Sequence, residues 1–142
     1  MIIKEQLDEK VSTGQDVATL MRGILGMESE IDKGKEHFWI IGLNVKNRIM
    51  FIDLVSLGTL SASLIHPRET FRLAIHRGVA SIIAVHNHPS GDPAPSRDDI
   101  AITERLGEAG EILGIKLLDH VIFGNDGDAY ISMLEKGYIK AA

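Results

Sequence analysis

The chain of 142 residues contains no cysteine. Disulfide bonds and thiolate metal ligands are therefore excluded, and a reducing compartment suits the chain. Any zinc site must be built from histidine and carboxylate side chains. A ligand set of that kind is more typical of catalytic zinc than of structural zinc.

Long apolar runs and an excess of positive charge are also missing. No stretch approaches the roughly 18 uninterrupted apolar residues that suggest a membrane-spanning helix, and the charged N-terminus lacks the apolar core of a signal peptide. We therefore expect a cytoplasmic protein with no membrane partner. Fifteen Lys and Arg against 20 Asp and Glu give a formal net charge of −5, which argues against a broad nucleic-acid-binding surface.

Hydrophobic residues make up 44% of the chain, which is enough to form a core, and charged residues make up 25%, as in ordinary globular proteins. The length suits one domain. We expect a loosely held N-terminal arm over residues 1–11 and a single domain over residues 12–142, with no internal repeat.

Apolar residues at helical spacing predict three helices, the first opened by a capping box of Ser12 and Gln15. Short apolar runs bounded by turn residues predict strands. The helices are expected at residues 12–26, 67–77 and 96–113, and the strands at residues 37–45, 47–58, 79–85, 115–123 and 129–132, with a further short strand within residues 60–65. This order predicts a mixed β-sheet flanked by helices, an α/β or α+β fold.

A group of possible metal ligands follows the strand expected at residues 79–85. His86 and His88 are two residues apart, so at a strand end their side chains point the same way. A proline-rich loop then leads to a helix beginning at Ser96, with Asp99 in its first turn. Two histidines and one aspartate leave one position of a tetrahedral zinc ion open for water, as in hydrolytic zinc sites.

Each part of this group also has a plainer explanation. Two histidines near a strand end are often only polar loop residues. Ser96 and Asp99 have the spacing of a helix capping box, and an acid is favourable near a helix N-terminus in any case. Asp98 is a competing ligand from the same turn, although we prefer it as a solvated first-turn acid.

The combination is more specific than its parts. His-x-His-Pro, seven residues and then Ser-x-x-Asp resembles the metal-binding signature of the JAMM (JAB/MPN) metalloproteases. The longer string HNHPSGDPAPSRDD resembles the RadC branch of that family, as do HPRETF at residues 66–71 and LLDHVIFG at residues 117–124. The resemblance runs from about the first helix to the C-terminus.

This resemblance implies a JAB/MPN fold, a curved sheet between helices as in cytidine-deaminase-like proteins. It implies that His86, His88 and Asp99 ligate Zn²⁺, and that Ser96 hydrogen-bonds the attacking water or the tetrahedral intermediate. An upstream glutamate would act as general base. The activity implied is hydrolysis of a peptide or isopeptide bond in a peptide or protein substrate by metal-activated water.

Four glutamates compete for the role of general base. Glu36 directly precedes the strand expected at residues 37–45, where the family places its acid. Glu28 and Glu30 lie in a polar connection, and Glu69 fits the first turn of a helix. We favour Glu36, with an ordinary surface role as its alternative.

Two further residues are candidates to support the site. Asn87 should point away from His86 and His88 and pin the loop that follows them. His120, next to Asp119, is either a hydrogen-bonding partner of a metal ligand or a structural histidine.

Two other functions remain open. Some MPN relatives are non-catalytic interaction modules. The RadC label suggests a DNA-repair-associated protein that processes or binds nucleic acid. Longer RadC-like chains carry an N-terminal helix-hairpin-helix module, and we expect none here because fewer than 20 residues precede the first helix. The metal-ligand pattern and the acidic charge favour the hydrolase.

Overall fold

The computed structural model describes residues 1–5, 7, 9–58, 60–61 and 63–140. Its elements are β1 (Ile2–Glu5), α1 (Gly14–Gly26), α2 (Glu30–Lys33), β2 (His37–Leu43), β3 (Ile49–Leu57), α3 (Pro67–Arg77), β4 (Ser81–His88), α4 (Arg97–Leu113), β5 (Lys116–Gly124) and β6 (Tyr130–Ser132). The strands form one sheet in the order β1-β3-β2-β4-β5-β6. Among the strands of the described residues, only β4 and β5 pair in parallel, so the predicted mixed sheet is confirmed.

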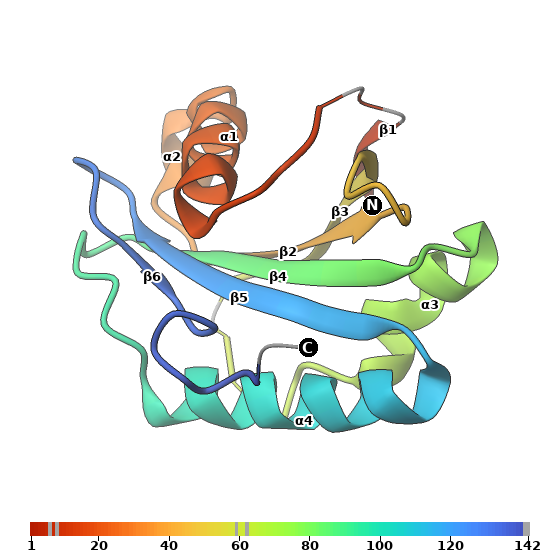
Figure 1. Cartoon of the computed structure of the whole chain (residues 1–142). Helices are drawn as coiled ribbons and strands as arrows, with labels where there is room; N and C mark the ends of the chain where they lie inside the picture. Colours follow the sequence, from red (N-terminus) through yellow and green to blue (C-terminus); the bar gives the residue numbers. More distant parts are fainter. Residues whose placement is uncertain (6, 8, 59, 62, 141–142) are drawn as a thin grey trace.

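The sheet is curved and lies between two layers of helices, with α1 and α2 on one face and α3 and α4 on the other (Figure 1). The buried strand β2 supplies both layers because successive side chains alternate between faces. Phe38 and Ile40 pack with the core under α3 and α4, whereas Trp39 and Ile41 pack with the core under α1.

Two helices end and begin where the sequence predicts. Helix α3 has Pro67 in its first turn and ends at Gly78, whose φ of 65° is a left-handed conformation that glycine adopts without strain. Helix α4 begins after Ser96, which forms a capping box with Asp99. The helix therefore starts at a defined residue and carries Asp99 in a fixed first turn.

The start of the first helix differs from the prediction. The capping box is formed by Thr13 and Asp16, one residue later than the expected pair of Ser12 and Gln15. Thr13 has an extended backbone and its hydroxyl accepts the Asp16 N–H at 3.1 Å. The Asp16 carboxylate in turn accepts the Thr13 N–H at 3.2 Å, which makes the box reciprocal.

Two other expectations are wrong. The arm predicted over residues 1–11 is not loose at its start, because Ile2–Glu5 forms β1 and pairs antiparallel with β3; Gln6 and Asp8 lie outside the described residues. The short strand expected within residues 60–65 does not form in the residues described there, and Ala62 lies outside them.

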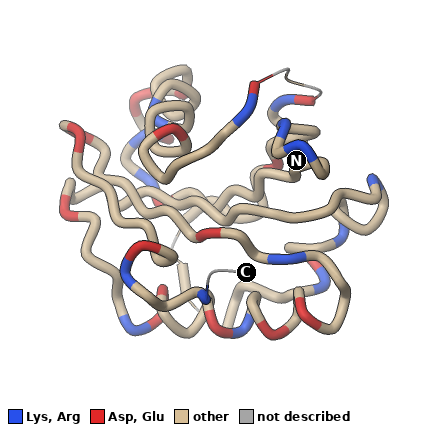
Figure 2. The backbone as a smooth tube through the Cα atoms, viewed as in Figure 1, with Lys and Arg blue, Asp and Glu red and all other residues tan. Residues whose placement is uncertain are grey.

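Figure 2 shows acidic and basic residues interspersed along the helices and loops. The central strands β2 and β4 contain no Lys, Arg, Asp or Glu. Among the described residues, no helix is long and apolar enough to cross a bilayer.

Candidate metal centre

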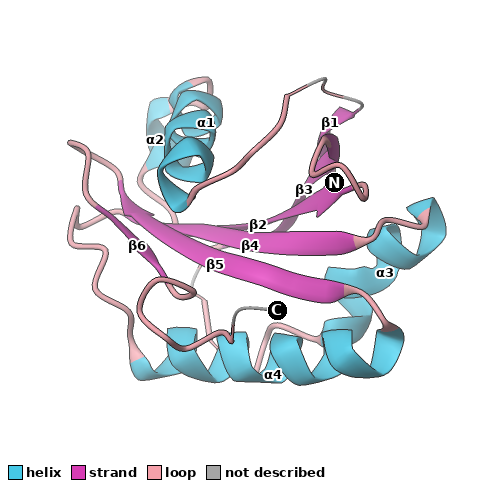
Figure 3. Ribbon diagram, viewed as in Figure 1, coloured by secondary structure: helices cyan, strands magenta, loops and turns pink. Residues whose placement is uncertain are grey.

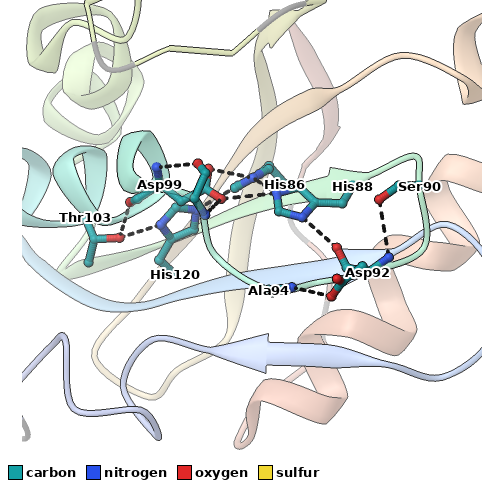
Figure 4. A network of polar contacts seen from close by, with 9 residues as sticks. His86, His88, Ser90, Asp92, Ala94, Asp99, Thr103 and His120 are labelled. Atoms are coloured by element: carbon teal, nitrogen blue, oxygen red, sulfur yellow. Dashed lines mark hydrogen bonds and ion pairs between the residues drawn. The ribbon is translucent and has the colours of Figure 1, made fainter.

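The two histidines of the motif lie on one face of the sheet. Strand β4 continues to His88, three residues beyond the predicted end, so alternation along the strand directs His86 and His88 to the α4 side (Figure 4). Their Nε2 atoms are 3.0 Å apart. His86 is fully buried, whereas the side chain of His88 is 16% exposed.

Helix α4 brings the carboxylate of Asp99 to the same point. The loop between β4 and α4 (pink in Figure 3) turns the chain back across the strand end. Asp99 Oδ1 lies 3.1 Å from His86 Nε2, and Oδ2 lies 3.1 Å from His88 Nε2. These three residues form a cluster that can hold a metal ion. Asp98, the competing ligand, is exposed and is not part of that cluster.

The spacing of the cluster suits a zinc ion. Ligand atoms about 2.0–2.1 Å from a tetrahedral zinc ion lie about 3.3 Å from one another, close to the 3.0–3.1 Å separations found here. The ring of His88 presents the correct nitrogen, because its Nδ1–H donates to the Asp92 carbonyl at 2.8 Å and leaves the lone pair on Nε2. A lone pair that faces a carboxylate at such a distance needs a cation or a proton between them.

Charge interactions within the cluster are strong. Burial alone would raise the pKa of Asp99, but hydrogen bonds from His86 and His88 outweigh it and hold that pKa well below its ordinary value. The hydrogen bond to Asp99 raises the pKa of His88 against the opposing effect of burial. In the metal-free protein the cluster therefore attracts protons, with which a metal ion competes.

A buried histidine stands directly behind His86. His120 is fully buried and its Nε2 lies 2.9 Å from His86 Nδ1 (Figure 4). Its Nδ1 lies 2.7 Å from the hydroxyl of Thr103. Burial lowers the pKa of His120 to about 3, so the ring is neutral. Sequence reasoning missed Thr103, although its position four residues after Asp99 on a helix was a usable signal.

Ser96 takes the plainer of its two expected roles. Its hydroxyl accepts the N–H of Asp99 at 3.1 Å, and its own N–H donates to Asp99 Oδ2 at 2.8 Å. The capping box therefore fixes the carboxylate that belongs to the cluster. Because the hydroxyl acts as an acceptor in this box, its proton stays available for a further acceptor.

Glu36 is placed near the cluster by strand pairing. It directly precedes β2 and is half-buried. Two residues later, Phe38 is the pairing partner of His86 across β2 and β4. The negative charge of Glu36 contributes to the raised pKa of His88, after the larger effect of Asp99.

The other three glutamates have separate partners. Glu28 contacts Nε2 of the buried His37 at 3.1 Å. Glu30 is exposed and pairs with Lys33. Glu69 is exposed in the first turn of α3, with its Oε1 3.8 Å from Arg68 Nε.

Asn87 points away from its two neighbours, as expected, but it holds a different segment from the one predicted. Its Oδ1 accepts the His37 N–H at 2.7 Å, and its amide group donates to the Lys35 carbonyl at 3.0 Å and to Asn125 Oδ1 at 2.8 Å. It therefore fastens the peptide groups on both sides of Glu36. The expectation that it pins the loop after His88 is corrected, because Asn87 lies on the α1 face and that loop leaves towards α4.

Fold and site together define an α+β domain with a His–His–Asp cluster that can hold a metal ion. The RadC-like JAB domain matches residues 11–138, and the chain belongs to this family. The curved mixed sheet flanked by helices is consistent with the JAB/MPN fold.

Curated relatives of the chain are named UPF0758 proteins. A UPF0758 protein of Caldanaerobacter subterraneus subsp. tengcongensis is 55% identical over 128 residues, which is 90% of this chain and 52% of the relative. One of Methanosarcina mazei is 46% identical over 136 residues, 96% of this chain and 56% of the relative. One of Desulforudis audaxviator is 60% identical over 92 residues, 65% of this chain and 40% of the relative. The chain thus spans about half the length of these relatives, whose names state no reaction.

Proposed function

We propose that the chain is a zinc-dependent hydrolase of the JAMM type that cleaves a peptide or isopeptide bond. The observation that carries the proposal is the meeting of His86 Nε2, His88 Nε2 and the Asp99 carboxylate at 3.0–3.1 Å. Three ligands leave a fourth position of a tetrahedral ion for water or substrate. The partial exposure of His88, against the complete burial of His86, gives that position a side that opens to solvent.

Zinc is the metal that we favour, because imidazole and carboxylate are its usual catalytic ligands. A zinc ion in this set acts as a Lewis acid, which makes water available as a nucleophile near neutral pH. The residues of the chain supply the remaining steps.

In this proposal Glu36 is the general base. It takes a proton from the attacking water and later passes it to the leaving amine. The hydroxyl of Ser96 donates a hydrogen bond to the scissile carbonyl oxygen, on which negative charge grows. Two observations support these roles: Ser96 caps α4 and bonds Asp99, and Glu36 directly precedes β2, whose Phe38 pairs with His86. Such positioning reduces the entropy cost of assembling the reactants.

A peptide or protein substrate is favoured over DNA by charge. Acidic and basic residues are interspersed along the chain in Figure 2, and the net charge is −5. Nucleic-acid backbones are bound by clustered positive charge. The DNA-repair role suggested by the RadC label remains a prediction.

The test uses the zinc-loaded chain with libraries of fluorogenic peptides and of lysine ε-isopeptides. We expect cleavage by the wild type, and a loss of about 10²–10⁴-fold in Glu36→Gln with zinc still bound at close to one ion per chain. Glu69→Gln is the matched control, because this glutamate is exposed on α3, and it should cleave at the wild-type rate.

Two results would contradict the proposal. Full cleavage by Glu36→Gln would assign the base to another residue. A wild-type chain that holds zinc but cleaves neither library would remove the support for a peptide or isopeptide hydrolase and favour the non-catalytic MPN module.

A further inference from the structure

We propose that Thr103 and His120 are positioning residues that fix the ring tautomer of His86 and so keep its Nε2 available as a metal ligand. This inference rests on the metal-binding part of the proposed function and is independent of the bond that is cleaved. It assigns a role to a hydroxyl group that is buried in α4 and belongs to none of the three proposed ligands.

A backbone carbonyl determines which groups donate in the hydrogen bonds between Thr103, His120 and His86. The Thr103 hydroxyl lies 2.8 Å from the carbonyl oxygen of Asp99, one helical turn earlier. A carbonyl can only accept, so the single proton of the hydroxyl is directed at it. The Thr103 oxygen is then the acceptor in its 2.7 Å contact with His120 Nδ1, and that nitrogen carries the proton.

The protonation of His120 in turn determines which nitrogen of His86 carries a proton. A neutral His120 with its proton on Nδ1 has its lone pair on Nε2. That lone pair faces His86 Nδ1 at 2.9 Å, which makes His86 Nδ1 the donor. A neutral His86 therefore has its lone pair on Nε2, where a metal ion, or a proton in its absence, can lie between this atom and Asp99 Oδ1 at 3.1 Å. The same atom lies 3.0 Å from His88 Nε2.

Hydrogen bonds in the opposite direction would prevent His86 from binding a metal ion. If His120 carried its proton on Nε2, it would donate to His86 Nδ1. The proton of His86 would then sit on Nε2, and a protonated nitrogen cannot ligate a metal ion. Thr103 is what selects between these two states, because its hydroxyl accepts from one particular nitrogen of His120.

Thr103, His120 and His86 form a hydrogen-bonded relay. Its surroundings prevent water from replacing the Thr103 hydroxyl. Thr103 is 1% exposed, and His86 and His120 are fully buried. The rings of His120 and Phe38 pack nearly at right angles, with centroids 6.0 Å apart. A hydroxyl lost from Thr103 would therefore not be replaced from bulk solvent, and His120 Nδ1–H would be left unpaired.

The chain offers a close control for the test. Thr70 is also 1% exposed, but its hydroxyl has no hydrogen-bond partner. Thr103→Val and Thr70→Val make the same change of a hydroxyl to a methyl group in a buried site. Only Thr103→Val removes a link to the metal cluster, and Thr103→Ser keeps that link.

We would measure zinc affinity by competition with a chromophoric chelator for the wild type and these variants. Thr103→Val should bind zinc about 10–100-fold more weakly, as is typical when a partner of a metal ligand is removed. Thr103→Ser and Thr70→Val should stay close to the wild type. Wild-type affinity in a folded Thr103→Val would overturn the proposal.

A second readout needs no variant and no metal. Two-bond ¹H–¹⁵N spectra of the metal-free wild type at alkaline pH report which nitrogen of each histidine ring is protonated. We expect protons on Nδ1 of His86 and of His120, and a shift towards Nε2 in Thr103→Val. A proton on Nε2 of His120, or none on Nδ1 of His86, in the wild type would overturn the relay. These spectra also decide the inference if the wild type binds no zinc, which would contradict only the proposed function.

Discussion

The side-chain oxygen of Asn87 accepts the backbone N–H of His37 at 2.7 Å, so a residue of β4 holds the first residue of β2. The amide group of the same side chain donates to the carbonyl of Lys35 at 3.0 Å. Glu36 lies between these two anchored peptide groups. Asn87 therefore fixes the proposed base from one face of the sheet, while its neighbours His86 and His88 present their rings on the other face.

We predict that Asn87→Ala destabilises the protein while leaving its metal content unchanged. The substitution leaves the buried N–H of His37 unpaired, which costs about 1–3 kcal/mol in the free energy of unfolding. Zinc should stay close to one ion per chain because Asn87 faces away from the ligands. Urea unfolding and elemental analysis measure the two quantities.

Asn125→Ala is a suitable comparison, because it removes the bonds of Asn125 to Asn87 and to the Lys33 carbonyl but keeps the Asn87–His37 bond. Its loss of stability should be smaller. Equal stability of Asn87→Ala and the wild type would show that the anchor contributes little.

We also predict that Gly124→Ala disturbs the metal centre through the loop that follows β4. A Cβ atom at Gly124 would lie 2.1 Å from the carbonyl oxygen of Gly91, so the backbone of that loop must move. The loop contains Asp92, whose carbonyl holds Nδ1 of His88. Zinc affinity should therefore fall by about tenfold or more, as measured by chelator competition.

Gly107→Ala makes the same chemical change on α4, where an added Cβ meets no atom within 4 Å. It should raise the free energy of unfolding by about 1 kcal/mol, because alanine favours a helix over glycine, and leave zinc affinity unchanged. Unaltered zinc affinity in Gly124→Ala would contradict the role given to the loop.

The stability of the metal-free protein should depend on pH through His120. Burial lowers its pKa from 6.5 to about 3, so between these values the unfolded chain binds a proton that the folded chain does not. Stability contributed by the neutral ring is therefore lost as the pH falls below about 6.5, by up to about 1.4 kcal/mol per pH unit.

His120→Gln removes this titration and keeps a neutral amide that can both donate and accept. Urea unfolding in the presence of EDTA at pH 7, 6 and 5 should show the wild type losing stability faster than His120→Gln. Parallel pH profiles would mean that His120 is not held neutral by the fold.

The sequence alone was sufficient to predict that the three residues of the cluster come together. Alternation along a strand placed His86 and His88 on one face, and the capping spacing placed Asp99 in a first helical turn. Both are local rules, and the structure follows them. They also identified α4 as the element that faces the histidines.

The supporting residues depended on features that local patterns do not contain. A β-bulge in β5 makes Leu118 an extra residue between the partners of Ile82 and Ile83. This shift pairs His120, rather than Asp119, with Ala84 and so directs the histidine towards α4. Strand periodicity gives no position for such a bulge, which is why the role of His120 remained open at that level.

The early strand β1 shows a similar limit. Its four residues are too few for a periodic signal, and they form a strand because the edge of β3 is available to pair with them. Asn87 likewise gained its partners from residues 38 to 52 positions away in the chain. Long-range pairing, rather than composition, determines both the formation of β1 and the hydrogen bonds of Asn87.

The most direct test of the metal centre is an anomalous-difference map from zinc-loaded crystals, recorded on both sides of the zinc absorption edge. We predict one peak about 2.0–2.2 Å from His86 Nε2, from His88 Nε2 and from an oxygen of Asp99. A zinc peak elsewhere, or fully loaded crystals with no peak between these three residues, would contradict the account.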